Sequence, residues 1–174
     1  MAFLSDLQNL VTAAEQPPRQ GPIEWDAANG EGDEVGGPQI QMNGKLYDKG
    51  IGMHSSHPER EPSDPEVSRV VFDLSGQSYD VFKADIGLQD EKLIDPNTDS
   101  VSAISVEFVV RVDGEVRYDS DLMVAGSRIQ YVEVNVSNAS TLELILENGG
   151  DYGINFSRVS GIRKNSDHGN WGNA

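Results

Sequence analysis

The sequence predicts an all-β protein built as an antiparallel β-sandwich or jelly roll. Hydrophobic and polar residues alternate with a period of two through the C-terminal two-thirds of the chain, which is typical of half-buried strands. Turn dipeptides such as Asn43-Gly44 and Asp113-Gly114 separate the alternating segments, as in sandwiches and barrels. Because 174 residues suit one hydrophobic core, we expect a single domain over residues 1–174.

The N-terminal segment Phe3–Glu15 has two interpretations. Its apolar residues fit one face of an amphipathic helix, or they form a short strand followed by irregular chain or a helical turn. Pro17-Pro18 ends any helix. The segment Asn29–Gly37, rich in glycine and acidic residues, is expected to be a flexible or ion-binding loop.

The next segments predict hairpins and closely packed backbone. Asn43-Gly44 predicts a tight turn. Gly50 and Gly52 flank Ile51, which indicates backbone running close to another element. Pro58–Glu66 contains three prolines and is expected to be a loop.

The following strands show their inward faces clearly. Arg69–Leu74 and Tyr79–Leu88 are predicted strands separated by a turn. Between residues 104 and 112 and between 142 and 146, every second residue is apolar. After the turn at Asp113-Gly114, we expect Val116 and Tyr118 to continue the inward face.

Charge and composition limit the possible partners. The net charge is −16, which argues against binding to a phosphate backbone or an anionic membrane. No run approaches the length of a membrane helix, and Met1–Leu4 lacks the features of a signal peptide. We therefore expect either a cytosolic chain or, by preference, a segment of a larger secreted protein.

Catalytic and metal motifs are absent from the sequence. We find no Gly-x-Ser-x-Gly elbow, no His-Glu-x-x-His pair, no Walker loop and no EF-hand. Among 29 acidic residues, some pair of carboxylates must lie at the distance that glycosidases use. Such a pair is therefore no evidence of glycosidase activity. The spacing of His54, His57 and His168 matches no zinc signature.

Several motifs in order carry a family resemblance. They are Leu4-Ser5-Asp6-Leu7, Gly50-Ile51-Gly52-Met53-His54-Ser55, Val71–Gly76, Phe82–Gly87, Val106–Asp113 and Asp167-His168-Gly169-Asn170-Trp171. Together they resemble the NPCBM family of bacterial carbohydrate-binding modules. The resemblance implies a galactose-binding-domain-like jelly roll that opens with a strand at Leu4–Leu7, so we favour the strand interpretation of this segment.

The chain also departs from the family pattern. We expect loop insertions near residues 57–67 and 155–166, and Asn170 replaces the acidic residue that is usual in the closing motif. These departures bear on the ligand preference more than on the fold.

The resemblance implies a sugar site made of aromatic platforms and hydroxyl partners. The candidate residues are Trp25, His54, Asp90, Glu91, Asn148, Asp151, Tyr152 and Trp171. Each aromatic ring has core packing as its alternative role. His54 has as its alternative a buried imidazole that holds loops together through hydrogen bonds.

Calcium is the cofactor that the resemblance implies, as a structural ion near the paired first and last strands. The candidate ligands are Asp6, Asp26, Asp167 and Asn170, which offer the hard oxygen atoms that calcium prefers. Each acidic residue has an ordinary solvated carboxylate as its alternative.

The expected function is therefore non-catalytic binding of a carbohydrate, with a terminal galactose-type sugar as the first expectation. The module would target a larger secreted bacterial protein to glycans, outside the cell or in the periplasm, alongside other domains of that protein. Two alternatives remain open. One is a structural or protein-interaction module without a working sugar site, and the other is a fragment of a glycosidase.

Overall fold

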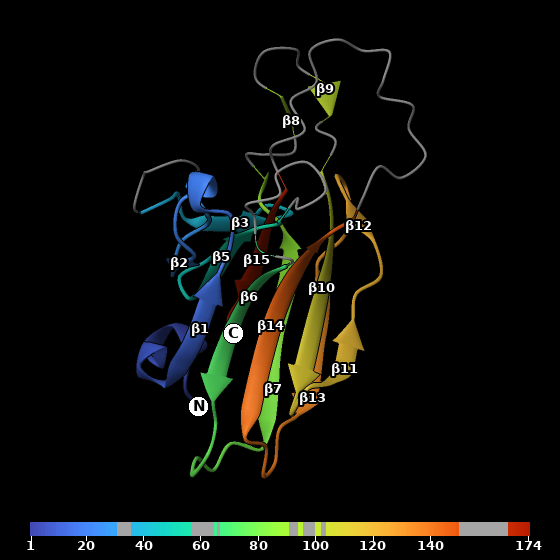
Figure 1. Ribbon diagram of the computed structural model, residues 1–174. Helices are drawn as coiled ribbons and strands as arrows, with labels where there is room; N and C mark the ends of the chain where they lie inside the picture. The colour runs from blue at the N-terminus through green and yellow to red at the C-terminus, as the bar shows by residue number, and fades with distance from the viewer. Residues whose placement is uncertain are drawn as a thin grey trace.

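The protein is a sandwich of two antiparallel sheets (Figure 1). The computed structural model describes residues 1–30, 36–56, 65, 67–90, 94–95, 100–101, 104–149 and 167–174. Within these ranges every strand pair is antiparallel. The helical elements there are the short 3-10 turns η1 (Leu4–Asp6), η2 (Gln8–Leu10) and η3 (Pro18–Gln20). The predicted fold class is confirmed.

The two sheets differ in their strand order. Sheet A runs β1 (Val11–Glu15), β6 (Ser68–Asp73), β14 (Thr141–Asn148), β10 (Ser105–Val112) and β11 (Glu115–Asp119), and β10 also pairs with β12 (Met123–Val124). Sheet B runs β13 (Gln130–Asn135), β7 (Val81–Leu88), β15 (His168–Gly172), β5 (Gly50–His54) and β2 (Glu24–Trp25). Two hairpins complete the fold, β3 (Ile40–Met42) with β4 (Lys45–Tyr47), and β8 (Ile94–Asp95) with β9 (Ser100–Val101).

The core lies between the inner faces of the two sheets. Phe72 and Phe108 from sheet A and Ile86 and Trp171 from sheet B have no exposed surface. The Trp171 ring meets Phe108 edge to face, with 5.1 Å between ring centroids, a favourable geometry for aromatic pairs. The period-two alternation of the sequence therefore marks the buried faces as expected.

The outer face of sheet B packs against the β3–β4 hairpin and the segment 27–29. A Cβ atom on Gly52 would lie 2.4 Å from the Ala27 carbonyl oxygen, and one on Gly172 would lie 2.5 Å from the Tyr47 ring. Only glycine permits this approach, which confirms the close backbone packing predicted from Gly50 and Gly52. The hairpin turns at Asn43 and Gly44, which both have positive φ, as the sequence predicts.

The order of elements at the N-terminus differs from the prediction. Leu4–Asp6 and Gln8–Leu10 are 3-10 turns, and the strand β1 follows them at Val11–Glu15. The expected opening strand at Leu4–Leu7 is therefore wrong. The short turns let Leu4 reach the core, where it is 7 % exposed, while its N–H donates to the Ala174 carbonyl.

The predicted inward face of β11 is also wrong at one position. Val116 is 55 % exposed, whereas Tyr118 is half-buried. The register between β10 and β11 shifts between Val110 and Arg111, and such a bulge changes the face to which later residues point.

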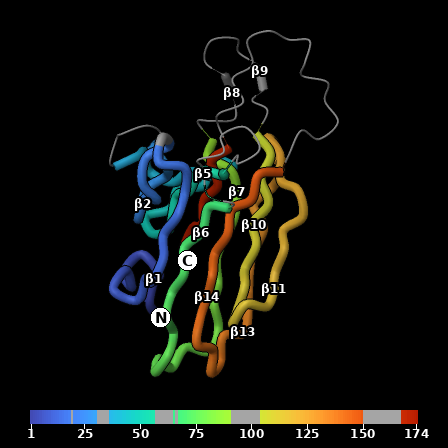
Figure 2. Tube along the Cα trace, viewed as in Figure 1, coloured from blue at the N-terminus to red at the C-terminus, as the bar shows by residue number. Residues whose placement is uncertain are grey.

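The chain trace brings the two termini to one side of the sandwich (Figure 2). The two predicted insertions, near 57–67 and 155–166, lie outside the described residues except for positions 65 and 67.

Candidate functional site at the loop end of sheet B

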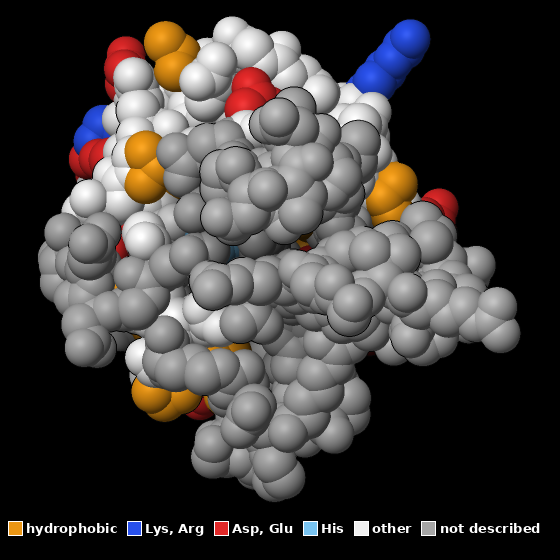
Figure 3. Space-filling model, turned by 90° about the horizontal axis from the view of Figure 1, so that it is seen from above, with side chains coloured by type: hydrophobic (Ala, Val, Ile, Leu, Met, Phe, Trp, Pro, Cys, Tyr) orange, Lys and Arg blue, Asp and Glu red, His pale blue; other side chains and the backbone are white. Residues whose placement is uncertain are grey.

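The candidate site lies where β5 and β7 finish and β15 begins, which we call the loop end. The register of the sheet sets His168 opposite His54 and Gly169 opposite Leu88. Figure 3 looks down on this end of the molecule, with acidic, basic and hydrophobic side chains of described residues at its margin.

The centre of the loop end is a pair of imidazoles. The His54 and His168 ring centroids lie 4.9 Å apart at an interplanar angle of 70°, and neither side chain is exposed. Both residues alternate with the inward-facing Met53 and Gly169, so both rings lie on the outer face of the sheet. The pair comes from two motifs more than a hundred residues apart in the sequence.

Backbone carbonyls fix the orientation of both rings. His54 Nδ1 lies 2.7 Å from the Ser55 carbonyl oxygen, and His168 Nδ1 lies 3.1 Å from the Asn29 carbonyl oxygen. Because a carbonyl only accepts, each Nδ1 carries the proton and donates it. In a neutral ring Nε2 is then an acceptor.

Two amide side chains hold the segments around the rings. Gln16 Oε1 accepts the His54 N–H at 3.1 Å, while Gln16 Nε2 donates to the Gly21 carbonyl at 2.7 Å. The Asn29 side-chain amide donates to the Pro22 carbonyl at 2.9 Å. These contacts tie the segment 21–29 to the end of β5. Sequence reasoning did not identify Gln16.

Asp167 joins the two sheets at the loop end. Its Oδ1 accepts the Ser105 N–H of β10 at 3.1 Å, and its backbone carbonyl accepts the Ser55 N–H at 3.0 Å. Asn148 ends β14 beside this contact, because Gly149 donates to the Ser105 carbonyl at 2.8 Å. His54, Asn148 and Asp167 of the predicted residues therefore gather at one end of the sandwich.

Asn170 and Gln89 form a buried amide pair under the β3–β4 hairpin. Asn170 Nδ2 donates to Gln89 Oε1 at 2.9 Å, and that oxygen also accepts the Gln41 N–H at 3.1 Å. Gln89 Nε2 donates to the Gln39 carbonyl at 3.2 Å. An uncharged amide in place of the family's acidic residue suits this buried network, because an unpaired carboxylate there would be costly.

The two predicted tryptophan platforms lie in the sandwich interior or against it. Trp171 is fully buried, so its ring offers no face to a sugar in this structure. Trp25 is half-buried and meets Phe72 edge to face at 6.3 Å. It pairs with Ile51, three residues before His54, or about 10 Å along the strand. In this structure both rings pack against the core, which is the alternative role that the sequence left open for them.

The remaining predicted sugar ligands divide into two groups. Asp90 is half-buried and binds the β3–β4 turn, accepting the Asn43 N–H at 2.7 Å and the Gly44 N–H at 2.6 Å. Glu91, Asp151 and Tyr152 lie outside the described residues.

The four predicted calcium ligands do not converge. Asp6 and Asp26 both bind the Lys49 ammonium, at 2.6 and 2.9 Å, near the rung that pairs Gly50 with Gly172. Asp167 precedes the rung at His168, about 13 Å further along β15. Within the described ranges, no group of three His, Asp or Glu side chains is placed to hold a metal ion.

The fold and this end of the sheet define a β-sandwich of the kind used by carbohydrate-binding modules. The model of the NPCBM/NEW2 domain matches residues 1–174. The chain therefore belongs to the NPCBM family, and the resemblance drawn from the sequence motifs is confirmed.

One curated relative is a much longer protein. The chain is 28% identical over 142 residues to the "Putative endo-alpha-N-acetylgalactosaminidase" of Renibacterium salmoninarum. The match covers 82% of this chain and 8% of that protein, so the chain spans a small part of the relative.

Several solved structures of similar fold contain CBM51 modules of Clostridium perfringens. One is the CBM51 of GH95 in complex with methyl-galactose, with a TM-score of 0.71 and 29% identity over 99% of this chain and 97% of that chain. Another is CBM51-2 of ZmpB in complex with GlcNAc, with its INT domains, at a TM-score of 0.68 and 25% identity over 99% of this chain and 30% of that chain. A third contains the M60 catalytic domain of ZmpB with two CBM51 domains, at a TM-score of 0.71 and 27% identity over 99% of this chain and 15% of that chain.

Proposed function

We propose that this chain is a non-catalytic module that binds a terminal galactose-type sugar at the loop end. The observation that carries the proposal is the end-to-end match with a module crystallised with methyl-galactose, together with the imidazole pair that both family motifs contribute at this end. The buried pair would brace the strand ends beneath the site, and the half-buried Asn148 would stand at its rim.

The proposed site suits weak, hydroxyl-directed binding. A side-chain amide such as that of Asn148 both accepts hydrogen bonds from hydroxyl groups and donates to them. For such a site we expect a dissociation constant between about millimolar and micromolar, or roughly 4–8 kcal/mol of binding free energy. Further domains of a parent protein would raise the effective affinity through avidity.

The module would act outside the cell as part of a larger secreted protein. Support comes from relatives that carry CBM51 modules beside a catalytic domain or other domains. No helix in the described part of the chain is long and apolar enough to cross a membrane. In this arrangement the catalytic step belongs to another domain, and this chain brings that domain to the glycan.

A structural or protein-interaction module is the second candidate function. It is favoured by the placement of Trp25 and Trp171, since neither ring presents an open face at the loop end. Under this candidate the imidazole pair only braces the ends of β5 and β15.

A glycan array separates the two candidates. The sugar-binding proposal expects hits that share one terminal sugar, and Asn148→Ala should weaken them while the melting temperature stays within a few degrees. Glu115→Ala, at an exposed position in sheet A, is the matched control and should bind normally. A blank array from folded protein would reject sugar binding in favour of the interaction module.

Structural calcium remains a proposal from the family resemblance. A chelator should lower the melting temperature if calcium binds the native state alone. Because Asp6 and Asp26 are engaged by Lys49, we expect Asp6→Asn to leave the response to the chelator unchanged. A melting temperature that is the same with and without chelator would contradict the calcium proposal.

A further inference from the structure

Part of strand β7 has a neighbour on one side only. β13 pairs with β7 from Val81 to Ile86, whereas β15 pairs with β7 only from Asp85 to Leu88. Within the described residues, positions 81–84 therefore form an open edge of sheet B, next to the chain termini.

The backbone groups of two residues point to this open side. The Asp80 carbonyl accepts the Val136 N–H at 2.9 Å, in line with the β13 register. Alternate residues of a strand direct their N–H and C=O groups to opposite sides. Val81 and Lys83 therefore direct theirs away from β13, where the β15 register would place Ala174 opposite Lys83.

A turn at the end of β15 removes the residue that would close this edge. Asn173 has a φ of 52°, a left-handed conformation that takes the chain out of an extended strand. Its N–H donates to the Lys49 carbonyl at 2.8 Å, and the Ala174 carbonyl accepts the Leu4 N–H at 2.8 Å. Ala174 is thus bound to the N-terminal segment instead of Lys83.

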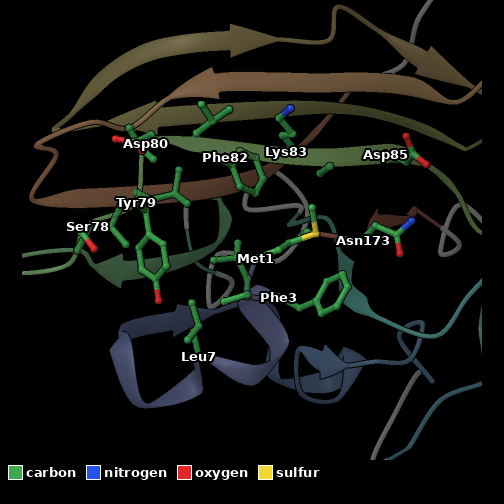
Figure 4. A pocket seen from close by; sticks show the side chains of 18 of the residues that line it. Met1, Phe3, Leu7, Ser78, Tyr79, Asp80, Phe82, Lys83, Asp85 and Asn173 are labelled. Carbon is green, nitrogen blue, oxygen red and sulfur yellow. The ribbon is translucent and has the colours of Figure 1, made fainter.

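An apolar groove of about 710 Å³ runs along the same edge. Figure 4 shows the β7 side and the N-terminal segment as its two walls. Apolar and aromatic side chains of both walls line it, among them Phe3, Leu7, Tyr79, Phe82, Val136 and Leu142. Asp80 and Asp85 also line it, together with Lys83.

We propose that this edge and groove bind an extended segment of a partner protein, which adds a strand to sheet B beside Val81 and Lys83. The unpaired backbone groups supply main-chain hydrogen bonds, and the groove receives every second side chain of the segment, which must be apolar. The net charge of −16 favours a partner segment that carries lysine or arginine.

Other occupants fit these observations less well. Two copies of the chain would bring two charges of −16 together, and such self-repulsion opposes a dimer. A sugar needs several polar partners for its hydroxyls, whereas the groove walls are mainly apolar.

A peptide titration followed by amide NMR tests the proposal. The probe is a short peptide in which lysine and valine alternate, added to the full chain. We expect saturable shifts centred on the amides of 81–84. The same peptide with methylated backbone nitrogens keeps its charge but cannot form the ladder, and it should bind at least about tenfold more weakly.

A pair of variants at one position provides the second test. Lys83→Pro removes an N–H that points to the open side, so it disturbs no existing ladder bond, and it should weaken peptide binding at least about tenfold. Lys83→Gln removes the charge but keeps the N–H, and it should bind within about twofold of the original chain.

Four results would overturn the proposal. The first is equal binding of the methylated peptide. The second is a set of shifts located away from 81–84. The third is displacement of the peptide by methyl-galactose or GlcNAc at this edge, which would make the groove a sugar subsite. The fourth is a dimer in sedimentation that Lys83→Pro dissociates, which would make a second copy the occupant.

Discussion

At the scale of single residues, Lys49 binds two of the carboxylates that the sequence suggested as calcium ligands. Its ammonium lies between Asp6 and Asp26, and Asp26 also accepts the Gly50 N–H at 3.1 Å. Burial acts to raise the pKa of Asp26, but the Lys49 ammonium and the Gly50 amide oppose it, and the pKa lies below its ordinary value. The sequence shows the acidic residues, whereas their partner is visible only when the N-terminal turns meet β5.

We expect Lys49→Met to weaken the dependence of stability on acidic pH. Since the pKa of Asp26 is lowered in the folded state, its contribution to stability is full above the unfolded pKa and is lost as the pH falls through the folded pKa. Denaturant titrations of both proteins between about pH 2 and pH 6 measure the difference. Arg117→Met, which breaks an exposed pair with Glu115, is the control. If the free energy of unfolding falls equally steeply with decreasing pH in Lys49→Met and in the original chain, Lys49 does not set the pKa of Asp26.

Asp90 presents a second contrast between a predicted ligand and an observed structural contact. Its carboxylate binds two amides of the β3–β4 turn, so Asp90→Ala should cost about 1–2 kcal/mol of unfolding free energy. Asp90→Asn keeps one acceptor oxygen and should cost less. Sugar affinity, measured by calorimetry, should be unchanged in both variants. Normal stability combined with loss of sugar binding in Asp90→Ala would show instead that Asp90 is a sugar ligand.

At the scale of elements, the strands on both sides of the core were predictable and the edges were not. Leu142, Leu144 and Leu146 alternate in sequence and are buried in the structure, because the two faces of β14 have different surroundings. Val116 follows the same pattern but is exposed, because β11 is an edge strand with a shifted register. A local pattern does not encode a bulge.

The segment 27–29 can pack against β5 only because residue 52 is glycine and has no side chain. A methyl group there would meet backbone atoms of Ala27, Ala28 and Asn29 at 2.4 to 2.6 Å, so Gly52→Ala should cost at least about 1–3 kcal/mol. At Gly169 the added methyl would meet the ends of the Leu146 and Phe108 side chains, which can shift, so Gly169→Ala should cost less. Thermal unfolding measures both. An equal or smaller loss in Gly52→Ala would contradict the role of backbone packing.

The candidate site was only partly predictable, because a local motif is visible in the sequence whereas the pairing of distant strands is not. The family resemblance pointed to His54 and to the closing motif with His168. It could not show that the two imidazoles meet, since this depends on the pairing of β5 with β15. The sequence also held no signal for Gln16 and Gln89, because glutamine is common on surfaces and only the fold brings these two side chains to the backbone groups that they bind.

At the scale of the whole molecule, the sandwich separates the two regions proposed to bind partners. The imidazole pair and Asn148 lie at the loop end, where β5 and β14 finish. The open edge of β7 lies at residues 81–84, where that strand begins and the termini meet. A module built in this way can hold a sugar at one end while its other end contacts a partner protein.

The most direct test of this account is a titration of the chain with methyl-galactose, followed by amide NMR with GlcNAc as the comparison sugar. The account predicts saturable binding at about millimolar to micromolar concentration, with shifts centred on His54, Asn148 and His168. It also predicts unmoved amides at 81–84. No binding by folded protein, or shifts centred away from the loop end, would contradict the claim that this end is the sugar site.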